Sequence, residues 1–160
     1  LRTHFRPDTS GDVSDSLEQI LRSPSAPVLA VPNADEDPGK WKRVLVAFNG
    51  SPNACRALKE FARISQPYQF EVTILSACKD QAHGETVVKS AAAYLRAHQI
   101  DQIETVVTDG GIQKVIDEEY IDSVDLVVAG IHSKKFLKDF FVGSLTRQLI
   151  DYGHTPLLLN

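Results

Sequence analysis

The residues best suited to chemistry gather in one loop and at the start of the helical pattern that follows it. The chain reads Gly130-Ile131-His132-Ser133, then residues 134–142, and then Gly143-Ser144. A glycine lets the backbone approach a ligand without a Cβ in the way. Backbone amides at a helix N-terminus favour an anion, and the Ser144 hydroxyl adds one donor. The residue types and spacing therefore predict a phosphate-binding loop.

Such a loop needs a scaffold, and alternating apolar runs and segments of helical period from Trp41 onward indicate one. Strands are expected at residues 43–48, 70–77, 103–108, 124–131 and 155–159, and helices at residues 54–62, 87–95, 112–120 and about 143–151. This alternation implies parallel strands joined by crossover helices. We therefore expect an α/β fold, a doubly wound five-stranded parallel sheet sandwiched by helices.

In open sheets of this kind, ligands bind beyond the carboxyl ends of the strands, where the strand order reverses. Residues 49–51, 77–80, 109–111 and 130–144 occupy that position. The same residue types also have structural explanations. Asn49 suits a turn, Ser51 suits a helix cap before Pro52, and Gly130 suits the end of a strand. Residue types alone thus leave ligand binding and a purely structural role both open.

The loop resembles that of the universal stress protein family, whose nucleotide-binding members carry Gly, two residues, Gly, nine residues, and then Gly-Ser or Gly-Thr. Gly130, Ser133, Gly143 and Ser144 occupy those places with matching spacing. Supporting matches are VLVAFNGSPNACRAL from residue 44, VDLVVAGIHS from residue 124, and a proline before the last strand. The resemblance covers residues 41–160.

The resemblance implies an adenine nucleotide alpha hydrolase-like fold and a stress-response regulatory module that binds ATP or AMP without efficient catalysis. By family position Ala77 would contact adenine, and Asn49 would hydrogen-bond a ribose hydroxyl. His132 follows its strand as a histidine often does in this family, which favours a supporting role. The candidate nucleotide-binding residues are Asn49, Ser51, Ala77, Gly130, His132, Ser133, Gly143 and Ser144.

Two departures from the family pattern keep other functions open. Ser133 replaces a glycine, and its Cβ costs about 1–2 kcal/mol if the site needs a left-handed backbone. Asn49 replaces the usual aspartate and lacks the negative charge useful for holding Mg²⁺, so a bound Mg²⁺ is doubtful. The second hypothesis is a nucleotide-free interaction or dimerisation module of the same family. A third is the regulatory domain of a larger transporter or kinase.

An internal repeat suggests how the chain is organised. Residues 14–31 align with residues 143–160 without gaps, with identities at Gln19 and Gln148, Pro27 and Pro156, and Leu29 and Leu158. We interpret residues 1–32 as the C-terminal tail of a preceding repeat, the acidic segment 33–40 as a linker, and residues 41–160 as a complete domain. An exposed apolar edge strand invites pairing.

The last strands of the two copies supply such edges. In members of the family that the chain resembles, the last strands of two copies pair edge to edge. The resemblance therefore implies that Val28–Val31 pairs antiparallel with Leu157–Leu159, in a pseudo-dimer within one chain or a homo-oligomer.

Composition and motif content argue against several classes of function. Lys plus Arg number 17 against 21 Asp plus Glu, a net charge of -4, which argues against nucleic-acid partners. No apolar stretch approaches the length of a membrane span, and no secretory signal opens the chain, so a cytoplasmic address is expected. Two cysteines and five scattered histidines give no disulfide framework or metal-ligand spacing. No catalytic motif is found, so we expect no enzyme. The absence of methionine suggests a piece of a longer chain.

Overall fold

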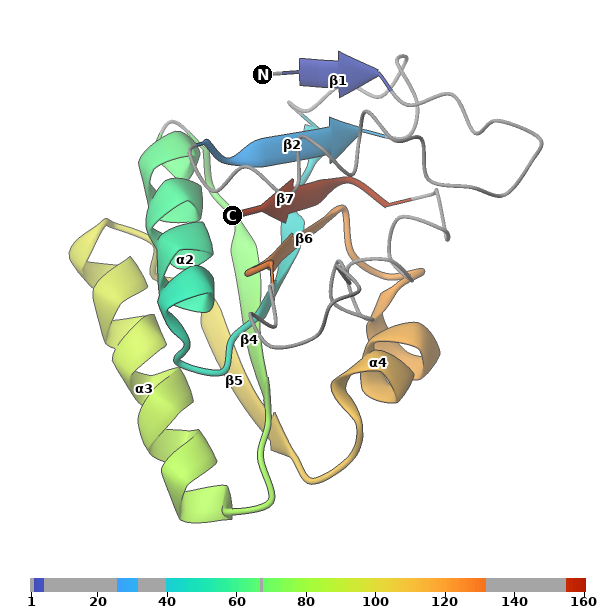
Figure 1. Ribbon diagram of the computed structural model, residues 1–160. Helices are drawn as coiled ribbons and strands as arrows, with labels where there is room; N and C mark the ends of the chain where they lie inside the picture. The colour runs from blue at the N-terminus through green and yellow to red at the C-terminus, as the bar shows by residue number, and fades with distance from the viewer. Residues whose placement is uncertain (1, 5–25, 32–39, 67, 132–154) are drawn as a thin grey trace.

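One mixed β-sheet with helices on both faces forms the part of the chain that the computed structural model describes, residues 2–4, 26–31, 40–66, 68–131 and 155–160 (Figure 1). The strands are β1 Arg2–His4, β2 Val28–Val31, β3 Arg43–Ala47, β4 Glu71–Ala77, β5 Ile103–Thr108, β6 Leu126–Ala129 and β7 Leu157–Leu159. The helices are α2 Pro52–Ser65, α3 Gln81–Ala97 and α4 Ile112–Val115, and the π-helix η2 Ile116–Tyr120 continues α4.

The strand order is β1-β2-β7-β6-β3-β4-β5. Strands β7, β6, β3, β4 and β5 run parallel to one another, which confirms the five-stranded parallel sheet expected from the sequence. The sequence also predicts Val28–Val31 beside the last strand, but it does not predict strand β1. Strands β2 and β1 extend the sheet to seven strands and make it mixed, because β2 is antiparallel to β7.

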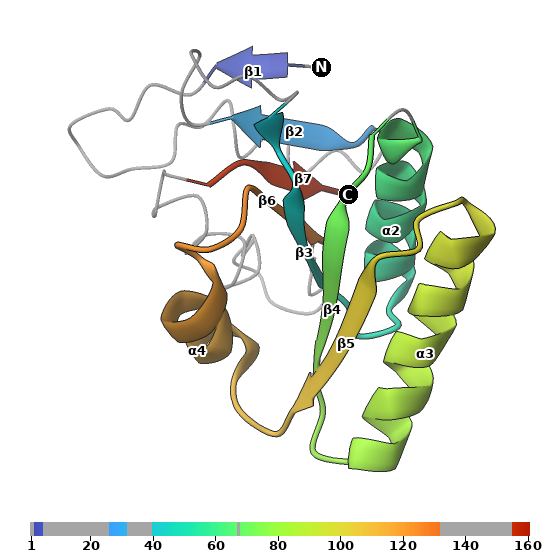
Figure 2. The same ribbon diagram turned by 180° about the vertical axis from the view of Figure 1, so that it is seen from behind.

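The pairing of β2 with β7 matches the prediction made from the internal repeat, and it occurs within one chain (Figure 2). Val28 pairs with Leu159, Leu29 with Leu158, and Ala30 with Leu157. On either side, β1 runs parallel to β2 and β6 runs parallel to β7. The four strands β1-β2-β7-β6 therefore show the same pattern of directions when read from either end.

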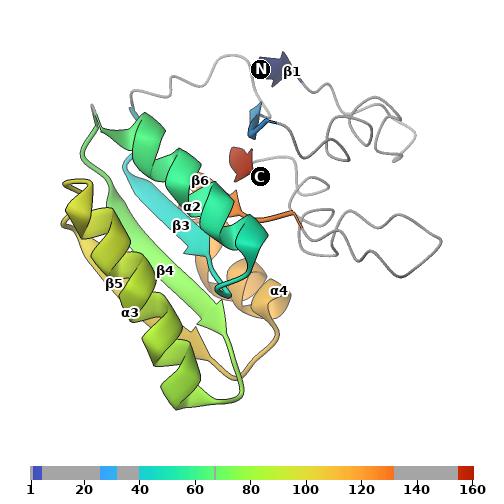
Figure 3. The same cartoon turned by 60° about the vertical axis from the view of Figure 1, so that its left-hand side comes forward.

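The two faces of the sheet carry separate apolar layers. Helices α2 and α3 cover one face, and α4 with η2 lies on the other (Figure 3). Successive residues of β3 alternate between them, so that Val44 and Val46 pack toward α2 and α3 while Leu45 packs toward Ile116. All three residues of β3 are almost fully buried. A strand covered on both faces explains the continuous apolar run that the sequence shows.

Helix α2 begins and packs as the sequence predicts, whereas α3 packs as predicted but begins at Gln81, six residues before the expected range. Ser51 caps α2, with its Oγ accepting a hydrogen bond from the Ala54 amide at 3.2 Å. Asp80 caps α3 in the same way through the His83 amide at 3.1 Å. The helix faces predicted from apolar spacing are the buried ones, as shown by Phe61 on α2.

The third helix is less regular than its apolar spacing suggested. It changes from an α-helix to the π-helix η2 at Ile116, and the Ile121 amide donates to the Ile116 carbonyl at 2.8 Å. Ile116 is fully buried. The helix expected at about residues 143–151 lies outside the described residues.

Candidate functional site

The predicted ligand position lies at the ends of three neighbouring strands. Strand β3 has β4 on one side and β6 on the other, and the chain reaches β4 next but β6 only much later. The strand order thus reverses at β3, which is where doubly wound sheets bind ligands. We call the ends of these three strands and of the next strand β5, with the residues that follow them, the carboxyl edge: residues 47–51, 77–80, 108–111 and 129–131. The ends of β4 and β5 can be followed to this edge at the bottom of Figure 1.

A tight turn links β3 to α2 at this edge. Gly50 has φ +73°, a backbone conformation that favours glycine. The Ser51 amide donates to Asn49 Oδ1 at 3.0 Å, so that the asparagine side chain closes the turn. Ser51 then caps the helix, and its carbonyl accepts from the Cys55 amide at 2.9 Å. The structural roles proposed for Asn49 and Ser51 are therefore both observed.

Gly130 lies against the first turn of α2. A Cβ built on Gly130 would come within 2.6 Å of the Asn53 carbonyl carbon and 2.9 Å of Ala54 Cα, closer than a real Cβ can approach backbone atoms. Its missing side chain therefore lets the end of β6 touch the helix. This packing contact explains why residue 130 is a glycine, without the close approach of a ligand that the sequence suggests.

Asn53 is a residue of this edge that sequence reasoning missed. Its side-chain Nδ2 donates a hydrogen bond to the Ile131 carbonyl, and its Oδ1 accepts one from the Arg56 guanidinium. Asn53 thus ties the first residues of the predicted phosphate loop to α2. The only sequence signal for Asn53 was its place in the first turn of a helix. That position alone does not indicate a hydrogen-bond partner as distant in sequence as Ile131.

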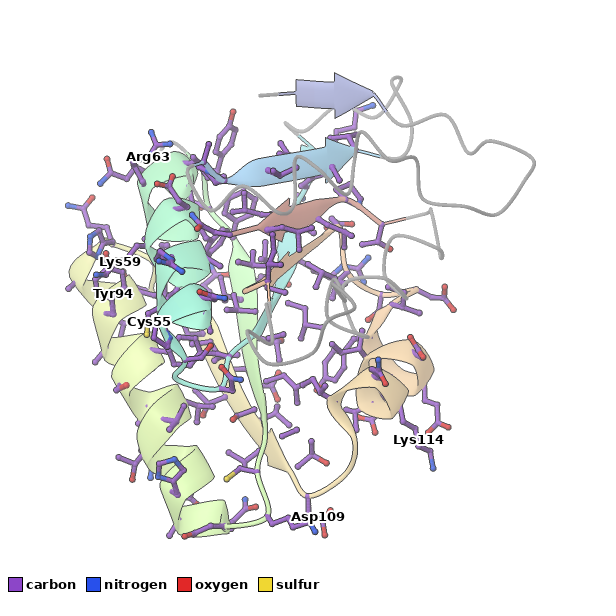
Figure 4. All side chains as sticks on the ribbon, in the orientation of Figure 1. Cys55, Lys59, Arg63, Tyr94, Asp109 and Lys114 are labelled. Carbon is purple, nitrogen blue, oxygen red and sulfur yellow. The ribbon has the colours of Figure 1, made fainter. Side chains whose placement is uncertain are left out.

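Ala77 ends β4 and is half-buried beside Thr108, its neighbour on β5. The next amide along, that of Cys78, donates to the Thr108 carbonyl at 2.8 Å. The following Asp109-Gly110 turn is closed by the Gly110 amide and Thr108 Oγ1 at 3.0 Å. Asp109 projects at this end of the molecule, while Lys114 projects from α4 (Figure 4).

The structure thus brings four candidate residues to one edge from adjacent strands. Asn49 and Ser51 follow β3, Ala77 ends β4, and Gly130 follows β6. The other candidates, His132, Ser133, Gly143 and Ser144, lie outside the described residues. Within the described ranges, no group of three or more His, Cys, Asp or Glu side chains could hold a metal ion. Nor does any helix in those ranges have the length and apolarity to cross a membrane.

A parallel sheet of this order, with helices on both faces and a strand-order reversal at β3, defines the doubly wound α/β class with the adenine nucleotide alpha hydrolase-like fold. The model of the universal stress protein family matches residues 40–159. The chain belongs to the universal stress protein family. No curated protein matches the sequence.

Several solved structures share the fold. Universal stress protein UspA from Lactobacillus plantarum is 22% identical with a TM-score of 0.60, over 75% of this chain and 97% of that one. A universal stress protein from Archaeoglobus fulgidus DSM 4304 is 18% identical with a TM-score of 0.72, over 91% of this chain and 55% of that one. This chain therefore spans about half the length of the archaeal protein. A universal stress protein in complex with cAMP is 18% identical with a TM-score of 0.56, over 74% of this chain and 95% of that one.

Proposed function

We propose that this chain is a stress-response regulatory module that binds an adenine nucleotide, ATP or AMP, beyond the carboxyl edge without efficient catalysis. The observation that carries the proposal is the convergence of Asn49, Ala77 and Gly130 from three adjacent strands at the point where the strand order reverses. The complex of a related fold with cAMP supports an adenine nucleotide as the ligand class.

The residues have distinct roles in this proposal. Ala77 offers a small apolar surface to the adenine, and Asn49 offers a neutral polar group to the ribose. The turn that Asn49 and Ser51 close, through the bond to the Ser51 amide at 3.0 Å, holds that group in place. The glycine-bounded loop from Gly130, with His132, Ser133, Gly143 and Ser144, provides the phosphate contacts. Because Asn49 is uncharged, the proposal needs no Mg²⁺.

Isothermal titration calorimetry with ATP and AMP tests the proposal. We expect a dissociation constant in the micromolar range, with GTP as the control for base selectivity. Replacing a hydrogen bond to a charged phosphate weakens binding by about 1.5–3 kcal/mol, so Ser144→Ala should lose at least about tenfold in affinity. The matched control is Ser90→Ala on α3, whose hydroxyl donates to its own helix at Val87. The absence of a binding heat with millimolar ATP or AMP would exclude the proposal.

The second candidate function is a nucleotide-free interaction module. It is supported by the contact of Gly130 with α2 and by the cap at Ser51, because both explain those residues without a ligand. In this alternative the important feature is the β2–β7 pair. Residues 1–32 are then the tail of a preceding copy, 33–40 a linker and 41–160 the domain.

Sedimentation velocity separates the two functions. An interaction module should form a homo-oligomer or a larger assembly whose mass ATP does not change, and calorimetry should record no nucleotide heat. A nucleotide-binding module should give a heat of nucleotide binding in calorimetry, whether it is a monomer or an oligomer. A constant monomer mass across concentrations, together with nucleotide heat, would eliminate the interaction module.

A further inference from the structure

A cavity of about 400 Å³ opens at the edge of the sheet opposite the carboxyl edge. It lies where β3, β4 and β5 begin, beneath the segment that joins η2 to β6. None of Asn49, Ser51, Ala77 and Gly130 lines it. Its side chains of chemical interest are Arg43, Glu71, Thr73, Glu104, Tyr120 and Ser123. The volume suits a small organic molecule and lies within the usual range of ligand pockets.

Two carboxylates stand on the same side of this cavity. Alternate residues of a strand share a face, so Glu71 and Thr73 point to the same face as Leu75, which packs against η2. Thr73 on β4 pairs in register with Glu104 on β5. Glu71 and Glu104 are thus diagonal neighbours on adjacent strands, and both are exposed.

Among the described residues that line the cavity, the cation is Arg43, and it pairs with a carboxylate outside the lining. The Arg43 guanidinium lies 3.7 Å from Asp125. The Asp125 carboxylate also accepts from the amides of Lys42 and Arg43, at 2.9 and 2.8 Å, which fixes it there. Arg43 further stands opposite Glu71 in the β3–β4 register. The negative charge of Glu104, on the far strand, is therefore the least compensated of the cavity.

Tyr120 brings an aromatic ring to the same end of the cavity. It is the last residue of the π-helix η2, an irregular helix type that is frequent at functional sites. Ser123 fixes the backbone there, because its Oγ donates to the Tyr120 carbonyl at 2.9 Å. Burial, and then Glu119 and Glu104, raise the pKa of the Tyr120 phenol above 10.0. The ring is therefore neutral at physiological pH.

We propose that this cavity binds an organic cation, a primary ammonium or a guanidinium group, between the Glu104 carboxylate and the Tyr120 ring. A carboxylate supplies the charge-assisted hydrogen bond, and an aromatic ring adds a cation–π contact. Glu71 extends the negative surface, so that a ligand with two amines could place its second amine there. The Thr73 hydroxyl offers a further acceptor. The site is distinct from the carboxyl edge and does not depend on nucleotide binding.

Titration of ¹⁵N-labelled protein tests this site with three probes. The probes are 1,4-diaminobutane as a free cation, Nα-acetyl-lysinamide as a lysine side chain, and n-butanol as the neutral control. Both cations should shift the amide signals of Thr73, Glu104 and Ser123 and leave those of Asn49 and Gly130 in place. Tighter binding of the diamine identifies a free polyamine-like cation, and tighter binding of the lysinamide identifies a lysine side chain of another protein. No saturable shift with millimolar cation would overturn the proposal.

Variants separate ion pairing from simple filling of the cavity. Glu104→Gln should weaken binding of the cation about fivefold, the size expected of an exposed ion pair. Tyr120→Leu should weaken it further, whereas Tyr120→Phe keeps the ring and should retain most of the affinity. The control Glu85→Gln removes an equal charge on α3, where Glu85 pairs with Lys89 at 2.9 Å. Equal affinities for Glu104→Gln and Glu85→Gln, or equal binding of n-butanol, would exclude the cation site.

Discussion

Leu29 and Leu158 are direct partners in the β2–β7 ladder and are also equivalent residues of the internal repeat. Val28 pairs with Leu159, which is the repeat equivalent of Ala30. Ala30 in turn pairs with Leu157, which is the repeat equivalent of Val28. A contact in which equivalent residues exchange places in this way has local two-fold symmetry. The pairing therefore has the form of a symmetric dimer interface that is built within one chain.

Leu29 and Leu158 should be energetically coupled. Both side chains belong to the apolar layer under α2, and Leu158 is only 3% exposed. Leu158→Ala should lower the free energy of unfolding by about 2–4 kcal/mol. A double-mutant cycle with Leu29→Ala should give a coupling of about 0.5–1 kcal/mol, measured by urea denaturation.

Leu95 provides the control for that cycle, because it is buried in the same layer but on α3. Leu29→Ala and Leu95→Ala should be additive. An additive result for Leu29 and Leu158 as well would contradict a direct energetic interaction between these two side chains.

Gly130 should tolerate no side chain. In Gly130→Ala the new Cβ meets the backbone of Asn53 and Ala54, so β6 and α2 must move apart. Such overpacking costs about 1–3 kcal/mol of stability. Gly111→Ala is the matched control, since a Cβ there meets nothing within 4 Å and φ is -67°. Equal thermal stabilities of the two variants would contradict the contact between Gly130 and α2.

Ser51→Ala should destabilise α2 through the loss of its cap. The Ala54 amide loses its acceptor at 3.2 Å, which lowers the free energy of unfolding by about 0.5–2 kcal/mol. Ser51→Gly should cost only a few tenths of a kcal/mol, because glycine is itself a good N-cap residue. Chemical denaturation of the two variants checks the difference, and identical losses would show that the cap bond is not the cause.

Asn49→Asp should make nucleotide binding depend on Mg²⁺. The substitution keeps an oxygen that can accept from the Ser51 amide but adds a negative charge, the ligand type that Mg²⁺ prefers. With ATP, calorimetry should show an affinity that Mg²⁺ hardly changes in the wild type and clearly raises in Asn49→Asp. The same Mg²⁺ effect in both proteins would contradict the role given to Asn49.

Tyr120 should make stability fall at alkaline pH. Its pKa is raised above 10.0, by burial first and then by Glu119 and Glu104. Between pH 10.0 and the higher native pKa, the unfolded chain has lost this proton and the native protein has kept it. The stability contributed by the protonated phenol is thus fully present below the unfolded pKa and is lost as pH rises through the native pKa.

Tyr120→Phe isolates this effect because it has no titrating proton. Its free energy of unfolding should fall less steeply with rising alkaline pH than that of the wild type. NMR of ¹³C-labelled tyrosine gives the native pKa directly. A Tyr120 titration at or below the ordinary tyrosine value would contradict the burial of the phenol.

Much of the fold could be predicted because local patterns and tertiary structure agree. Val44, Leu45 and Val46 form an uninterrupted apolar run, as a strand buried on both faces requires. Ser51 and Pro52 mark the start of α2 by their own chemistry. The antiparallel pair of β2 and β7 could be predicted from the repeat together with the family resemblance, because the last strands of two copies pair edge to edge in that family.

Other features depend on contacts that no local pattern contains. The spacing of Ile112, Ile116 and Tyr120 fits an α-helix, yet the chain widens into η2 where Ile116 is buried against the sheet. Strand β1, Arg2–His4, has no apolar pattern, and it pairs with β2, a neighbour that its own sequence does not indicate. At the candidate site, Gly130 could be recognised from its spacing, but its contact with Ala54 arises from packing between β6 and α2.

The most direct test of nucleotide binding at the carboxyl edge is a titration of ¹⁵N-labelled protein with ATP and AMP, followed amide by amide. We predict saturable shifts at Asn49, Ser51, Ala77 and Gly130, with the amides of Glu71 and Ile103 at the opposite edge unchanged. Shifts confined to the opposite edge, or none with millimolar nucleotide, would contradict the account.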